Sequence, residues 1–221
     1  HQAPRSRRRL RPMILFGASE TGLELRRQAD GSTRLAGRFP YNRLAVLSDG
    51  GRNGRPRKEQ FAPRAFGFRV DQPSEEIHLL VGHDFAKPLA SRGAGTLRLT
   101  DSDEALTFEA TISQAIAETS FGRDALALIA AGLAVGLSPG FRLPPERAVP
   151  RDQAERIEEE PMRPEAGMHG ALIRTILQAL LFELSIVTRP AYDAAQVEAR
   201  CWTPGRPAVP SPLAAMRRWR R

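Results

Sequence analysis

A serine between glycines and a histidine after an apolar run are the residues of this sequence best suited to chemistry. Ser138 lies in segment 136–141 (GLSPGF), where glycines permit tight backbone geometry and let a substrate carbonyl approach backbone N–H donors. His83 directly follows the run 77–82, and an imidazole there can act as a general base near neutral pH. Each residue alone is also typical of an ordinary turn or strand end. Their residue types are those of a nucleophile and a general base.

The sequence around these two residues argues against two other kinds of site. Segment 136–141 is not the nucleophile elbow of an α/β-hydrolase, because no doubly wound pattern surrounds it. His78, His83 and Asp84 are close in sequence, but in a strand over 77–82 positions 78 and 83 point to opposite faces. We therefore predict that the protein uses neither a metal nor a cofactor.

Most elements that must position these residues are short strands. Several runs alternate apolar and polar residues, as half-buried antiparallel strands do. The predicted strands cover residues 13–17, 23–27, 33–39, 43–48, 76–82, 96–100 and 105–112. Residues 49–57 (DGGRNGRPR) are dense in glycine, asparagine and proline, which predicts an exposed loop.

The second half of the chain shows three further patterns. Residues 119–132 predict a helix, with Thr119 or Ser120 as its N-cap. Segment 144–170 combines prolines with a dense acidic block and predicts a mobile loop. Segment 171–188 predicts a helix that passes into a strand near 183–188.

The basic charge of the chain is concentrated at its two ends. The sequence has 33 Lys and Arg against 25 Asp and Glu, a net charge of +8. Nine of the arginines lie within residues 1–11 and 217–221, which leaves 24 basic against 25 acidic residues elsewhere. We expect one folded domain over residues 13–203, a basic disordered arm over 1–12 and a disordered basic tail over 204–221. The near-neutral body and the 6% aromatic content disfavour a nucleic-acid-binding β-barrel.

Cysteine content and hydropathy indicate the compartment. Cys201 is the single cysteine, and one cysteine cannot form an internal disulfide framework. No apolar run approaches the roughly 18 residues that a membrane span requires. We expect a cytoplasmic protein. The chain opens with His1, which is compatible with processing of its start, and Met13 is an alternative start.

Six short segments occur in the same order and at similar spacing as in a known family. They are residues 37–42 (GRFPYN), 59–66 (EQFAPRAF), 79–84 (LLVGHD), 106–111 (LTFEAT), 136–141 (GLSPGF) and 183–191 (ELSIVTRPA). Together they resemble the caudovirus prohead protease family, over residues 35–198. The resemblance implies a catalytic histidine and a nucleophilic serine that match His83 and Ser138. At Pro139 the family more often has an apolar residue such as isoleucine or phenylalanine.

The resemblance also implies a fold similar to the capsid-maturation proteases of herpesviruses. We therefore expect a β-rich α+β domain in which a closed antiparallel β-barrel is surrounded by a few helices. In such a fold the strand with the third catalytic residue follows the nucleophile, which favours Glu183, while Glu109 is the alternative. A carboxylate behind the imidazole fixes its tautomer and stabilises the imidazolium. Backbone N–H groups around Ser138 to Gly140 are candidates for an oxyanion hole.

The implied function is that of a serine endopeptidase that cleaves capsid and scaffold proteins during prohead maturation of a tailed phage or phage-like particle. Its implied partners are the major capsid protein and its scaffold segment, and its implied location is inside the assembling capsid precursor. Self-cleavage and formation of a homo-oligomer are compatible with this function. The alternative is a catalytically silent capsid-assembly or scaffold protein with the same fold, against which the intact histidine and serine motifs argue.

Overall fold

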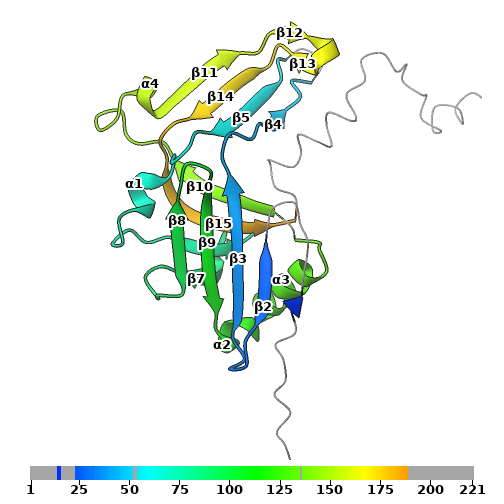
Figure 1. Ribbon diagram of the computed structural model, residues 1–221, viewed down its shortest axis with the longest axis vertical. Coiled ribbons are helices and arrows are strands. Elements are labelled where there is room, and N and C mark those ends of the chain that lie inside the picture. The colour runs from blue at the N-terminus through cyan, green and yellow to red at the C-terminus, as the bar shows by residue number, and fades with distance from the viewer. Residues whose placement is uncertain (1–13, 16–22, 52–53, 135, 189–221) are drawn as a thin grey trace, which may run out of the picture.

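The computed structural model describes residues 14–15, 23–51, 54–134 and 136–188, and most of them form strands (Figure 1). The strands are β1 (Ile14–Leu15), β2 (Glu24–Arg27), β3 (Thr33–Pro40), β4 (Ala45–Ser48), β5 (Arg57–Phe61), β6 (His78–Val81), β7 (Asp84–Ser91), β8 (Leu97–Asp101), β9 (Ala105–Ile112), β10 (Gly136–Arg142), β11 (Glu155–Glu159), β12 (Met162–Arg163), β13 (Met168–His169), β14 (Leu172–Ile176) and β15 (Leu180–Val187). The helices are α1 (Gly67–Val70), α2 (Gln114–Ala117), α3 (Ser120–Ala130), α4 (Arg151–Ala154) and the 3-10 turn η1 (Pro164–Ala166). The predicted disordered basic segments at the two ends, residues 1–12 and 204–221, lie outside the described residues.

The strands form three main sheets and one two-stranded ribbon. The front sheet has the order β1-β2-β3-β9-β8, the site sheet β10-β15-β6-β7 and the arm sheet β11-β14-β5-β4, while β12 and β13 form the ribbon. All pairs in the front sheet are antiparallel. The site sheet contains the parallel pair β15–β6, and the arm sheet contains the parallel pair β14–β5. In Figure 1 the arm sheet lies at the top, beyond the end of β3.

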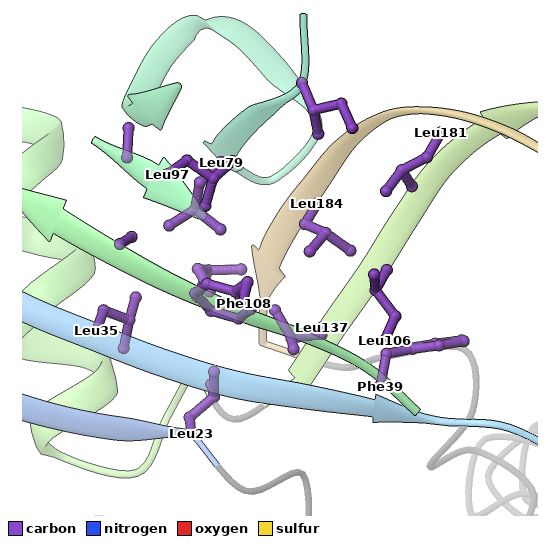
Figure 2. Packing of buried hydrophobic residues seen from close by; sticks show 14 of the residues in the cluster. Leu23, Leu35, Phe39, Leu79, Leu97, Leu106, Phe108, Leu137, Leu181 and Leu184 are labelled. Atoms are coloured by element: carbon purple, nitrogen blue, oxygen red, sulfur yellow. The ribbon is translucent and has the colours of Figure 1, made fainter. Parts of the chain in front are cut away.

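The hydrophobic core lies between the front sheet and the site sheet. Strand β3 alternates buried and less buried positions along its length, as a sheet with one covered face does. Leu35 and Phe108 from the front sheet face the site-sheet residues Leu137 and Leu184 (Figure 2). Gly37 shows how close the layers are, since an added Cβ would lie 3.2 Å from Leu137 Cδ1 of the site sheet, besides 2.7 Å from Phe108 Cε1 of its own sheet. Burial of these side chains is the main force that holds the two sheets together.

An aromatic cluster joins all three main sheets at one point. Phe61 of the arm sheet lies 5.4 Å from Phe39 of β3 and 5.0 Å from Phe141 of β10, measured between ring centroids. Phe66, just before α1, stacks against Phe61 at 4.9 Å. Edge-to-face and offset rings at these distances pack favourably. The arm sheet is therefore anchored directly to β10, the strand that carries Ser138.

The expected closed barrel is wrong. The described strands fall into separate sheets, and no strand pair joins one sheet to another among them. A barrel requires hydrogen-bonded neighbours all the way round, whereas here the front and site sheets meet through side chains. Alternation of apolar and polar residues is the same in a barrel wall and in a packed open sheet, so it predicted strands but could not distinguish these architectures. The prediction of a β-rich fold with few helices agrees with the structure.

The helix predicted over 119–132 is confirmed as α3, whose first turn is capped by Thr119 Oγ1 accepting from Gly122 N at 3.1 Å. The helix predicted within 171–188 is wrong, because the segment forms β14 and β15. Where the sequence predicts a loop over 144–170, the structure contains α4, β11, the ribbon and η1.

Ion pairs explain how the acidic residues of segment 144–170 become part of a sheet. Glu155 is buried and accepts hydrogen bonds from Arg151 and Arg174, and Glu160 is buried beside Lys58. Burial acts to raise the pKa of Glu160, but the hydrogen bonds from Lys58 and two backbone N–H groups outweigh it and hold the pKa below its usual range. The free-energy cost of burying a carboxylate is largely offset when cations and N–H groups pair with it, whereas an unpaired carboxylate carries the full cost.

Candidate active site

Strand β15 carries two buried polar side chains on the face that forms the site. Glu183 and Ser185 are two residues apart and therefore point to the same side of the strand, while Leu184 and Ile186 point into the core. The Ser185 hydroxyl donates to Glu183 Oε2 at 2.7 Å. A carboxylate that is 5% exposed is thus held by a neighbour on its own strand.

His83 lies in a tight turn between β6 and β7. Val81 and Asp84 are paired across this turn, and its two central residues, Gly82 and His83, both have φ of 61°. Two positive φ values are what a type I′ hairpin turn requires, and they are uncommon for a residue other than glycine. Two backbone N–H groups of the turn donate to β15, from Gly82 N to Ile186 O at 3.0 Å and from His83 N to Ser185 Oγ at 2.8 Å.

The turn brings the imidazole of His83 onto the buried carboxylate of Glu183. The distance from His83 Nδ1 to Glu183 Oε1 is 2.7 Å, and the histidine side chain is 46% exposed. A carboxylate at Nδ1 favours the tautomer with the proton on that nitrogen, which leaves Nε2 to accept a proton. The parallel pairing of β6 with β15 makes this contact between residues 100 positions apart.

Ser138 lies on the neighbouring strand, β10, directly opposite Ser185. Directly opposed residues of an antiparallel pair share one face of the sheet, with Cβ atoms about 5 Å apart. Ser138 therefore lies on the same face as Ser185 and Glu183, and it is partly exposed whereas Ser185 is fully buried. No hydrogen bond joins Ser138 to His83 within the described part of the chain, and such bonds are often long before substrate binds.

Gly140 gives the carboxylate of Glu183 the room that it needs. Gly140 lies directly opposite Glu183 in the β10–β15 pair. A Cβ added at position 140 would lie 1.9 Å from Glu183 Oε1 and 2.6 Å from its Cδ. Gly140 therefore has a steric role beside Glu183 in addition to the backbone freedom that it gives next to Ser138.

The other residues considered for the site have different surroundings. Glu109 lies on β9 at an exposed position between the buried residues Phe108 and Ala110, so it faces away from the core. His78 is the register partner of Glu183 in the β6–β15 pair, but its ring contacts Phe85, at 5.8 Å between centroids, and not the carboxylate's hydrogen-bond partners. Within the described residues, no group of three His, Cys, Asp or Glu side chains is arranged to hold a metal ion.

Ser185 was not identified from the sequence, although a signal for it exists. The pattern E-L-S over residues 183–185 places two polar side chains on one face of a strand that is otherwise apolar. Polar groups buried in this way require hydrogen-bond partners. A search for such pairs within predicted strands would have identified Ser185 together with Glu183.

A histidine bound to a buried carboxylate, on the same sheet face as a partly exposed serine, is the set of groups that serine hydrolases use. In a comparison with known families, the model of the caudovirus prohead serine protease matches residues 50–204, and the chain therefore belongs to this family. It is a family of serine proteases that act in phage capsid maturation. The match includes His83, Ser138 and Glu183. No curated protein and no solved structure matches the chain significantly.

Among the described residues, no helix has the length and apolar character to span a membrane.

Two charge-removing substitutions should distinguish Glu183 from Glu109. Glu183→Gln keeps the side-chain volume but removes the charge beside His83 Nδ1, and we expect kcat to fall by on the order of 10²-fold or more, as for loss of a triad carboxylate. Glu109→Gln should leave kcat unchanged, because Glu109 faces away from the core on another sheet. Cleavage rates on a capsid-derived peptide, with melting temperatures for both variants, test this. Equal small effects would indicate that the site works without Glu183.

Proposed function

We propose that the protein is a serine endopeptidase in which Ser138 is the nucleophile, His83 the general base and Glu183 the residue that orients the histidine. The observation that carries the proposal is the 2.7 Å contact between His83 Nδ1 and the buried carboxylate of Glu183. Membership of the prohead protease family makes capsid and scaffold proteins the substrates that we propose. The cleavage takes place during assembly of the capsid precursor.

The reaction follows from the chemistry of the three side chains. Ser138 Oγ attacks the carbonyl carbon of the scissile peptide bond while its proton passes to His83 Nε2. The negative charge of Glu183 stabilises the imidazolium that forms. His83 then gives the proton to the leaving amine, and water attacks the acyl-enzyme by the reverse sequence of proton transfers. Because Pro139 has no N–H, backbone donors to the oxyanion next to Ser138 cannot include position 139.

The position of β10 in its sheet supports a peptide substrate. Strand β10 is the first in the order β10-β15-β6-β7, so one side of its backbone has no strand partner among the described residues. An extended peptide can pair with such an edge and bring its carbonyl group to the strand that carries the nucleophile. Pro139 fits this position, since proline within a sheet occurs on edge strands.

A serine-directed fluorophosphonate tests the proposal directly. We expect the probe to add once to the protein by intact mass, and peptide mapping should place the added group on Ser138. His83→Ala should abolish labelling, because the base is lost, whereas His78→Ala should label normally. Labelling at another serine, or normal labelling of His83→Ala, would refute the assignment. A protein that folds but does not react would support the catalytically silent assembly protein instead.

A further inference from the structure

We propose that Ser185 is a positioning residue of this site, an inference that rests on the proposed function. Its hydroxyl holds the carboxylate of Glu183 and the backbone of His83 in a single arrangement. Ser185 does not touch substrate and acts only through these two residues.

The hydrogen bonds of Ser185 link both partners of the histidine–carboxylate pair. Its Oγ donates to Glu183 Oε2 at 2.7 Å and accepts from His83 N at 2.8 Å. The other carboxylate oxygen, Oε1, is the one that contacts His83 Nδ1. The carboxylate plane is thus fixed at both oxygens, and the same hydroxyl fixes the backbone from which the imidazole extends.

The backbone of His83 needs such support. A histidine with φ of 61° is in a conformation that residues other than glycine adopt only where the surroundings enforce it. Two backbone N–H groups of this turn donate to β15, and one of them, that of His83, donates to the Ser185 side chain. Loss of the hydroxyl would leave the His83 N–H and Glu183 Oε2 without these partners, and both would be free to move.

Ser185 is not a second nucleophile. It is 0% exposed, and its hydroxyl already donates one hydrogen bond and accepts another. Ser138, directly opposite on β10, is the partly exposed serine of the pair. Under the proposal, Ser138 attacks the substrate, whereas Ser185 holds the general base His83 and its carboxylate partner in position.

The test is the steady-state kinetics of Ser185→Ala in the full-length protein, on a peptide that spans a mapped capsid cleavage site. We expect kcat to fall by on the order of 10- to 100-fold with KM unchanged, since a displacement of about 1 Å in a catalytic group has effects of this size. Thr175→Val is the matched control, because Thr175 is a buried strand hydroxyl that accepts from Gln60 Nε2 at 3.1 Å on the arm sheet. It should change melting temperature but not kcat.

A double-mutant cycle with Glu183→Gln separates positioning from general destabilisation. If Ser185 acts through the histidine–carboxylate pair, Ser185→Ala should cost less than about 3-fold in the Glu183→Gln background. Full multiplication of the two effects would overturn the proposal, and so would an unchanged kcat for Ser185→Ala. If Ser185→Ala does not fold, Ser185→Cys replaces it, because it keeps the shape of the side chain and has only a weak S–H donor, and we expect an intermediate kcat. A wild-type kcat for Ser185→Cys would overturn the proposal. Undiminished cleavage by Ser138→Ala would instead refute the proposed function itself.

Discussion

Replacing Ser138 by alanine should abolish peptide-bond cleavage while leaving the protein folded. Loss of a nucleophile removes the covalent route, and we expect a fall in kcat on the order of 10⁴-fold or more. Ser138 is partly exposed on an edge strand, so the free energy of unfolding should change by no more than about 0.5 kcal/mol. Intact-mass measurement of a co-expressed capsid protein, together with a melting curve of the variant, would show both effects.

Two histidines provide an internal control for the Ser138 experiment. His83→Ala should be as inactive as Ser138→Ala, and the double variant should be no worse than either one, because the two residues act as a unit. His78 is the register partner of Glu183 in the β6–β15 pair, but its ring contacts Phe85 and forms no hydrogen bond with the carboxylate among the described residues, so cleavage by His78→Ala should continue. Cleavage by Ser138→Ala at the wild-type rate, or an inactive His78→Ala beside an active His83→Ala, would show that the site has been misassigned.

Gly140→Ala should be nearly as damaging, although the change adds only a methyl group. The new Cβ would overlap Glu183 Oε1 at 1.9 Å, so the carboxylate or the strand must move. Movement of the carboxylate separates Oε1 from His83 Nδ1, and movement of β10 displaces Ser138 from the histidine–carboxylate pair. We expect a loss of kcat on the order of 10²- to 10⁴-fold, comparable with loss of the carboxylate from a catalytic triad. The measurement is kcat on a capsid-derived peptide, with the rate of fluorophosphonate labelling as a second readout.

Gly67→Ala is the control for this substitution. An added Cβ at position 67 would lie 3.4 Å from its nearest neighbour, Asp71 Oδ2, which is an ordinary contact. Gly67→Ala should therefore retain both folding and cleavage. Wild-type activity in Gly140→Ala would mean that the Glu183 carboxylate can be displaced without consequence, which would argue against its role in orienting His83.

The sequence predicted the pieces of the site better than their arrangement. His83 after a strand and Glu183 within a later strand could both be predicted, because apolar runs and their ends are local properties. The parallel pairing of β6 with β15 could not, since periodicity identifies strands but not their partners. The alternation of apolar and polar residues did indicate that Glu109 is exposed, because it lies between Phe108 and Ala110 on the outward face of β9. The same pattern could not indicate on which sheet face the site is formed.

Segments 144–170 and 171–188 show why the remaining predictions failed. Acidic residues suggested a solvated loop, yet Glu155 and Glu160 are buried beside basic residues that include Lys58, far away in the sequence. In segment 171–188 the strand predicted near 183–188 agrees with β15, but the helix predicted before it is replaced by β14 and the start of β15, because pairing with β5 and β6 overrides that local preference. Both outcomes depend on contacts between distant parts of the chain, which local propensity does not record.

The central position of β15 has a consequence for when the protein can act. Strand β15 lies between β10 and β6, so it separates the strand of Ser138 from the strand that leads to His83. A nascent chain that has not yet emerged as far as β15 contains the serine and the histidine but has no strand to align them, and it lacks the carboxylate. Under the proposed function, hydrolytic activity therefore cannot begin before β15 has been synthesised. Under the same proposal, the order of the strands prevents partly synthesised copies of the protease from cleaving capsid proteins.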